Sequence, residues 1–212
     1  MMEIQKMINT MVPPIALKAS AKLAFNIKRH TVRRKLSGQE RLHLACGNNV
    51  LEGWANIDFR DNKQVVGWDL THDLPVHTET IALIFCEHFI EHITRKQAKS
   101  LLNECYRCLR TGGIIRLSTP SLKKIVGEYL SRRLSEWHDV GFVPATPCQM
   151  VNDGLRLWGH QFVYDEEELK LLLEETGFQD IALVEWREST IPELRNLECR
   201  PFHAEIILEA RK

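Results

Sequence analysis

Residues 87–92 (EHFIEH) form the densest group of ionisable side chains in the sequence. They follow directly on the apolar run 81–86, which predicts a buried strand. A carboxylate or an imidazole held at a strand end can take a proton from a reacting group. We therefore predict that Glu87 and His88 are catalytic residues.

The same group has the side chains of a metal site. His88, Glu91 and His92 are spaced so that side chains at i and i+4 share one face of a helix. His160 is a further candidate ligand downstream, and a site rich in imidazole favours Mn, Fe, Co or Zn over Mg. The spacing H-x-x-E-H also occurs in inverted zinc proteases, but there it lies within a helix, whereas here it follows a strand. A role in hydrogen bonding alone remains open.

Three more predicted strands end at turns or at polar groups. Residues 41–45 lead into the turn 46–49 (CGNN), whose residue types tolerate positive φ. Residues 54–58 end at a carboxylate, Asp58, and residues 114–118 end just before Pro120. The carboxyl ends of parallel strands meet at one edge of an open α/β sheet, where ligands bind. These segments therefore predict a ligand site at that edge.

Five motifs in this order resemble class I methyltransferases that use S-adenosylmethionine. They are LHLACG (42–47), GWANID (53–58), DLP (73–75), EHFIEH (87–92) and RCLRTGG (107–113), within a resemblance that covers roughly residues 38–212. The resemblance implies a Rossmann-like α/β sandwich with a mostly parallel sheet and an antiparallel C-terminal strand. It implies a methyltransferase domain over residues 38–212, preceded by a helical arm over residues 1–37.

The resemblance also implies a set of cofactor-binding residues, which are Ala45, Cys46, Gly47, Asp58, Asp73, Leu74 and Cys86. Asp58 would accept both ribose hydroxyls. Asp73 would accept from the adenine amino group, with Asp69 as a competitor for either role. The family normally has glycine where Ala45 stands and an acid where His43 stands.

The spacing between the turn and the first acid is short. Only 11 positions separate Gly47 from Asp58, whereas the dinucleotide-binding fingerprint places its acid about 20 residues on. Either the first crossover is reduced to a turn or two, or Asp58 is not the ribose carboxylate.

The resemblance implies methyl transfer from S-adenosylmethionine, and we expect an oxygen of a small molecule or of a glycan- or lipid-linked acceptor to receive the methyl group. With a metal bound, the resemblance extends to methyltransferases of terminal RNA ribose, which carry E-x-x-E-H and a downstream histidine, the place that His160 takes here. The alternative is a degenerate domain that binds cofactor or a partner without turnover.

The formal net charge is zero, but the charge is unevenly distributed. Residues 1–41 carry nine Lys or Arg and two Glu, a net +7, and the remaining residues carry a net −7. Residues 15–36 predict a helix whose basic stripe, within about 60° on a helical wheel, lies opposite small apolar residues. The stripe consists of Lys18, Lys22, Arg29 and Arg33. It fits an anionic membrane surface or docking on the acidic remainder of the chain, and nucleic acid is not expected as a partner.

The six cysteines are scattered through the sequence, which is typical of a reducing compartment. No apolar run reaches the roughly 18–20 residues needed to span a bilayer. We therefore predict a cytoplasmic protein that attaches to a membrane only peripherally, through the arm. Cys105 and Cys108 are interpreted as two packed residues of one helix.

The remaining elements are predicted from periodicity. Helices are expected over residues 94–109, 121–134 and 165–176, a weak helix over residues 1–12, and two late antiparallel strands over residues 181–187 and 203–211. Residues 135–164 contain several proline and glycine residues and predict an irregular substrate-binding or lid segment.

Overall fold

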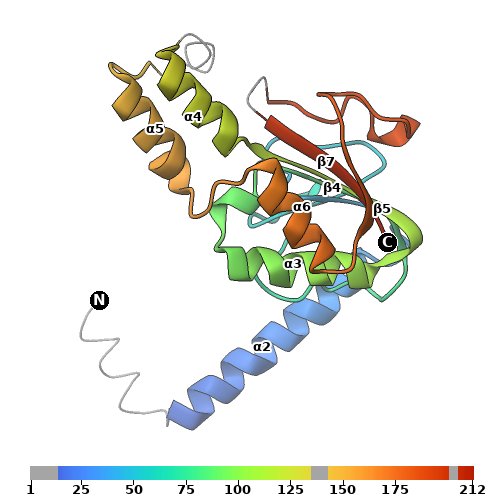
Figure 1. The fold of residues 1–212 in the computed structure, drawn as a ribbon. Coiled ribbons are helices and arrows are strands. Elements are labelled where there is room, and N and C mark those ends of the chain that lie inside the picture. Colours follow the sequence, from blue (N-terminus) through green and yellow to red (C-terminus); the bar gives the residue numbers. More distant parts are fainter. Residues whose placement is uncertain (1–13, 135–142, 201–204) are drawn as a thin grey trace.

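A seven-stranded sheet forms the centre of the molecule, with strand order β3-β2-β1-β4-β5-β7-β6 (Figure 1). The computed structural model describes residues 14–134, 143–200 and 205–212, with side chains from Ser20 onward. The strands are β1 (Arg41–Leu44), β2 (Ala55–Asp58), β3 (Val65–Gly67), β4 (Ile81–Glu87), β5 (Leu109–Pro120), β6 (Gln179–Leu183) and β7 (Glu205–Arg211). Six strands run in the same direction, and β7 runs in the opposite direction between β5 and β6. The predicted fold class is thereby confirmed.

Helices cover one face of the sheet. Side chains alternate between the faces along each strand, and Leu42, Leu44 and Ile84 belong to a large core shared with α2, α3 and α6. These helices span Pro14–Lys35, Arg95–Cys108 and Glu166–Glu174. The start of α3 is fixed by a reciprocal capping box between Thr94 and Gln97.

The opposite face is covered by irregular chain. Phe85 and Leu83 pack there against Leu194 and Leu197, which belong to the connection between β6 and β7. Residues 45–54, between β1 and β2, are too few for a covering helix, so the first crossover is a turn. This resolves the short spacing between Gly47 and Asp58.

A row of buried side chains, all but one of them polar, crosses this second face. The strand register places Asn56, His43, Phe85, Arg116 and Glu209 side by side on β2, β1, β4, β5 and β7. Arg116 is fully buried, and its guanidinium donates to Glu198 Oε1 at 2.5 Å and to Glu209 Oε1 at 2.6 Å. It also donates to the carbonyl of residue 188 at 2.8 Å. Arg116 therefore fixes the β6–β7 connection onto the sheet.

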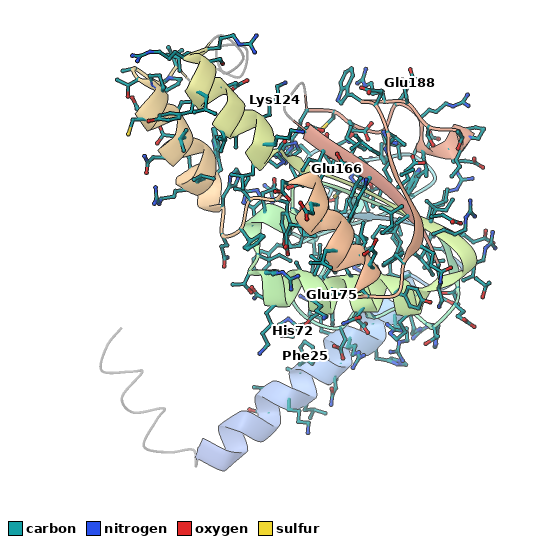
Figure 2. All side chains as sticks on the ribbon, viewed as in Figure 1. Phe25, His72, Lys124, Glu166, Glu175 and Glu188 are labelled. Carbon is teal, nitrogen blue, oxygen red and sulfur yellow. The ribbon has the colours of Figure 1, made fainter. Side chains whose placement is uncertain are left out.

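The C-terminal half of α2 is part of the main core. Val32 and Leu36 are buried, and Phe25 lies 5.6 Å from the Trp68 ring and 5.2 Å from the His72 ring, centroid to centroid. Figure 2 shows Phe25 and His72 close together where the helix meets the body. The predicted arm, residues 1–37, is thus integrated with the domain at its C-terminal end. Its predicted helix 1–12 lies outside the described residues.

The segment expected to be irregular contains a helix. Residues 147–156 form α5 (Pro147–Arg156), which packs beside α4 (Leu122–Ser131) around Ile125 and Met150. The prediction was wrong here because Pro147 was interpreted as a breaker, whereas it occupies the first turn of a helix capped by Thr146. Residues 135–142 lie outside the described chain.

The helix α3 buries both Cys105 and Cys108, which confirms their interpretation as packed residues. None of the helices in the described ranges is long and apolar enough to cross a membrane.

Candidate active site

The turn after β1 forms the first wall of the site. Ala45 and Gly47 both adopt left-handed conformations, with φ of 54°, so the chain turns sharply past the strand end. The Gly47 amide donates to Asp58 Oδ2 at 2.9 Å, which ties the turn to the end of β2. Ala45 thus takes the conformation that glycine adopts most easily, and its methyl group is small enough to permit it.

His43 is part of the scaffold beneath this turn. Its Nδ1 lies 3.1 Å from Asn56 Oδ1, which also accepts from the Leu51 amide at 3.0 Å. The Asn56 amide nitrogen donates to the carbonyls of Leu51 and Trp54, so its orientation is fixed and His43 must donate. Burial lowers the pKa of His43 to about 4, so the imidazole is neutral at pH 7.

The two other candidate carboxylates lie beyond β3. Asp69 lies two residues after the end of β3, and the register aligns Asp58 with Gly67, so both acids are near the carboxyl edge. The Asp69 carboxylate accepts from the amide and hydroxyl of Thr71 at 2.9 and 2.7 Å. The Asp73 side chain is 72% exposed and pairs with Arg29 of α2 at 3.7 Å. Its predicted neighbour Leu74 is completely buried in the main core.

Glu87 closes the edge at the end of β4, behind the buried Cys86. Its Oε1 accepts from the Cys199 amide at 3.0 Å and from the Arg200 amide at 3.1 Å, and Oε2 lies 3.2 Å from the Cys199 thiol. Both oxygens of this predicted catalytic base are therefore bound by the β6–β7 connection.

His88 lies at the centre of a buried charge cluster. Its Nε2 donates to Glu205 Oε1 at 2.7 Å, and its Nδ1 lies 3.2 Å from Glu91 Oε1. Burial lowers the pKa of His88, but Glu205 and Glu91 outweigh burial and raise it to about 9. At pH 7 His88 is therefore a cation. Burial opposes ionisation of Glu91, yet the adjacent His88 holds the pKa of that carboxyl below its usual value.

Three of the four predicted metal ligands converge. One ligand atom each of Glu91, His92 and His160 lies within 4.8 Å of the others. Glu91 Oε1 is buried and pairs with His88 Nδ1 at 3.2 Å, while Oε2 accepts from Thr119 at 3.0 Å. His160 Nδ1 lies 2.9 Å from the Gly154 carbonyl oxygen, to which it donates, so in the neutral ring Nε2 is the nitrogen available for a metal.

Backbone contacts hold these residues together across 69 positions of sequence. The Gln161 amide donates to the Glu91 carbonyl at 2.7 Å, and the Gln161 side chain donates to the His92 carbonyl at 2.8 Å. Burial lowers the pKa of His92, with its neighbour His160 acting in the same direction, so both hydrogen bonding and ligation by the neutral ring are available. The predicted fourth ligand, His88, lies beside this group and is held by Glu205.

Several site residues had no signal in the sequence. Glu205 reaches His88 because β7 pairs with β5, where Pro120 lies opposite Glu205, and β5 pairs with β4. Thr119 and the amides of Cys199 and Arg200 are brought in by the same pairing. The one indication in the sequence was that Glu205 lies near the start of the predicted strand 203–211.

The fold and the site together define a class. A sheet in which β7 is inserted antiparallel between β5 and β6, with a left-handed turn after β1 facing the acid that ends β2, is the architecture of a class I methyltransferase. Residues 26–183 match the model of the methyltransferase domain family, and the chain belongs to that family. It is an S-adenosylmethionine-dependent methyltransferase, as the sequence predicted.

Solved structures agree in fold. A SAM-dependent methyltransferase from Archaeoglobus fulgidus is 17% identical with a TM-score of 0.50, over 87% of this chain and 94% of that one. A Thermotoga maritima protein described as a possible histamine N-methyltransferase is 14% identical with a TM-score of 0.50, over 90% of each chain. Identities this low show a shared fold alone. No curated protein sequence matches this chain.

Proposed function

We propose that the protein transfers the methyl group of S-adenosylmethionine to a hydroxyl oxygen of a small molecule or of a glycan- or lipid-linked acceptor, beside a divalent metal. The observation that carries this proposal is the convergence of Glu91, His92 and His160 at the sheet edge, with one ligand atom of each within 4.8 Å of the others. The Glu91 carboxylate is buried, and its Oε1 lies 3.2 Å from His88 Nδ1 and 3.8 Å from His92 Nε2, so a negative charge and imidazole nitrogens meet at one point.

The residues at the carboxyl ends of β1 and β2 fit a bound cofactor. The turn 45–47 leaves a side of its backbone open, since a Cβ built on Gly47 would meet no atom within 4 Å. One oxygen of Asp58 is held by the Gly47 amide, and the other has only a long contact of 3.5 Å with the Arg60 amide. Asp58 would bind the ribose hydroxyls. For the adenine amino group we favour Asp69 over the more exposed Asp73, because Asp69 lies only two residues after the end of β3.

The metal ligands are proposed from their donor set. Two imidazoles and one carboxylate suit Mn, Fe, Co or Zn, and a bound cation would lower the pKa of an acceptor hydroxyl. Glu91 is oriented by Thr119, and His160 by the Gly154 carbonyl, so both ligands are held before any ion binds.

We assign deprotonation of the acceptor to the metal held by Glu91, His92 and His160. The predicted bases Glu87 and His88 are less suited to it. In the transfer, the acceptor oxygen bonds the methyl carbon as the carbon–sulfur bond breaks, and the hydroxyl proton leaves to a base or to water. Glu87 has both oxygens bound, and His88 is a cation at pH 7. Their catalytic roles stay predictions, and positioning of the strand ends is the role that their contacts favour.

The proposal also places the protein in the cytoplasm. All six cysteines are unpaired, and four of them are buried, which suits a reducing compartment.

The test combines metal content with turnover. Protein purified without a histidine tag should contain about one divalent ion per chain, and His160→Ala should lose it, while His77→Ala, an exposed histidine far from the cluster in sequence, should retain it. Transfer of a labelled methyl group to hydroxylated metabolites should fall by about 10²-fold or more in chelator. Full activity in chelator and in His160→Ala would remove the metal. Absence of turnover, with or without cofactor binding, would favour the degenerate module.

A further inference from the structure

The most unusual surface outside the active site is the outer side of α2. Leu23 is 62% exposed and Ile27 is 59% exposed, although both lie in a helix that continues into the hydrophobic core. Leu23 and Val32 are nine residues apart, as are Ile27 and Leu36. Nine residues make about two and a half helical turns, so each aliphatic side chain points to the side opposite its buried counterpart. These two aliphatic side chains therefore form a face that the body of the protein does not cover.

The charges of the helix are all of one sign. Its 22 residues contain seven Lys or Arg and no acid. Lys28 lies over the Trp68 ring, Arg29 pairs with Asp73, and Lys35 pairs with Asp61, so part of the charge attaches the helix to the body. Arg34 and His30 are exposed on the face of the aliphatic pair, and Lys22 is exposed on its flank, about 100° around the helix from Leu23.

The two sides of α2 can be occupied at the same time. Phe25, Val32 and Leu36 hold the helix to the sheet, whereas Leu23 and Ile27 are on the opposite side. Figure 1 shows the N-terminal half of α2 standing clear of the sheet and of the other labelled helices. A flat surface could therefore contact it without disturbing the core.

We propose that this face of α2 docks on an anionic lipid bilayer. Exposed aliphatic side chains one turn apart, on a helix that carries cations and no acid, are the pattern of a helix that lies in the membrane interface. A nucleic acid would use the cations but has no need of the aliphatic pair, and a protein partner would have to supply an apolar groove edged by acidic groups, whereas an anionic bilayer offers both. The inference goes beyond the proposed reaction and does not depend on it.

Docking would also orient the enzyme. Phe25 contacts Trp68 and His72, which follow the carboxyl end of β3, so the exposed end of α2 lies at the same edge as the cofactor turn. A bilayer under α2 would hold that edge near the membrane surface.

The experiment is flotation of the full chain with vesicles of phosphatidylcholine, with and without phosphatidylglycerol. We expect flotation with the anionic vesicles only, and its loss at about 1 M salt, where the Debye length is about 3 Å. The double variant Leu23→Asn, Ile27→Asn should bind about 10- to 100-fold more weakly, because two aliphatic side chains lose their burial. Leu171→Asn with Leu183→Asn, also exposed aliphatic residues, is the matched control and should bind as the unmodified protein does.

Unchanged melting temperature and cofactor affinity in the double variant would show that its fold is intact. The proposal is overturned if the chain ignores anionic vesicles, or if the double variant floats equally well. It is also overturned if the chain does not float and ultracentrifugation instead finds a dimer that the double variant does not form. Binding of duplex RNA without binding of vesicles would overturn it too.

Discussion

At the scale of single residues, the carboxylate of Asp58 is the group on which cofactor affinity should depend most directly. We expect Asp58→Asn to weaken S-adenosylmethionine binding by about 2–4 kcal/mol, because charge-assisted hydrogen bonds to the ribose are lost. Titration calorimetry measures this. Asp69→Asn should also weaken binding, and Asp180→Asn, exposed on β6, is the control. A loss in Asp73→Asn without one in Asp69→Asn would return the adenine contact to Asp73.

The neutral, buried His43 should make stability depend on pH. Its pKa is about 4 in the folded protein, below the ordinary 6.5, so between these values the unfolded chain binds more protons and stability rises with pH. Lowering the pH from 7 to 5 should cost about 2 kcal/mol through this group. Urea unfolding of His43→Gln should show a pH slope smaller by that amount. Equal slopes in both proteins would mean that the pKa of His43 is the same in the folded and unfolded states.

At the scale of elements, Arg116 decides whether the β6–β7 connection stays on the sheet. Arg116→Met would leave Glu198 and Glu209 buried without their cation, and we expect a loss of about 3–5 kcal/mol in unfolding free energy. Urea unfolding gives the value. Arg211→Met removes an exposed pair with Asp180 and should cost less than about 1 kcal/mol. Similar losses in the two variants would contradict the anchoring role.

The individual elements also show which parts of the fold and the site could be predicted from the sequence. The apolar runs that became β1, β2 and β4, and the turn and acid at their ends, are local patterns, so their places were predictable from adjacent residues. The pair of His88 and Glu205 was not, because it depends on how β4, β5 and β7 align across the sheet. The helix α5 was missed because a proline in its first turn resembles a breaker.

For the whole molecule, the described part of the arm, residues 14–37, divides into two parts. Residues 20–24 are all exposed, whereas Val32 and Leu36 pack with Trp68 and Leu74 in the main core. Removal of residues 1–20 should leave the melting temperature nearly unchanged. Removal of residues 1–37 should destabilise by more than about 4 kcal/mol, because two buried aliphatic residues and the cover over Trp68 are lost. Thermal unfolding of both truncations tests this, and equal melting temperatures would make the arm a separate unit.

The position of β7 has a consequence for synthesis of the protein. This strand comes last among the seven in the chain, yet it lies between β5 and β6 and not at an edge. A nascent chain that has emerged only as far as residue 200 therefore carries an open slot in its sheet, with unpaired backbone groups on β5 and β6. His88 also lacks Glu205 until the slot is filled. The charge cluster around His88 is thus assembled only after β7 has been synthesised, so a chain that stops before β7 cannot complete it.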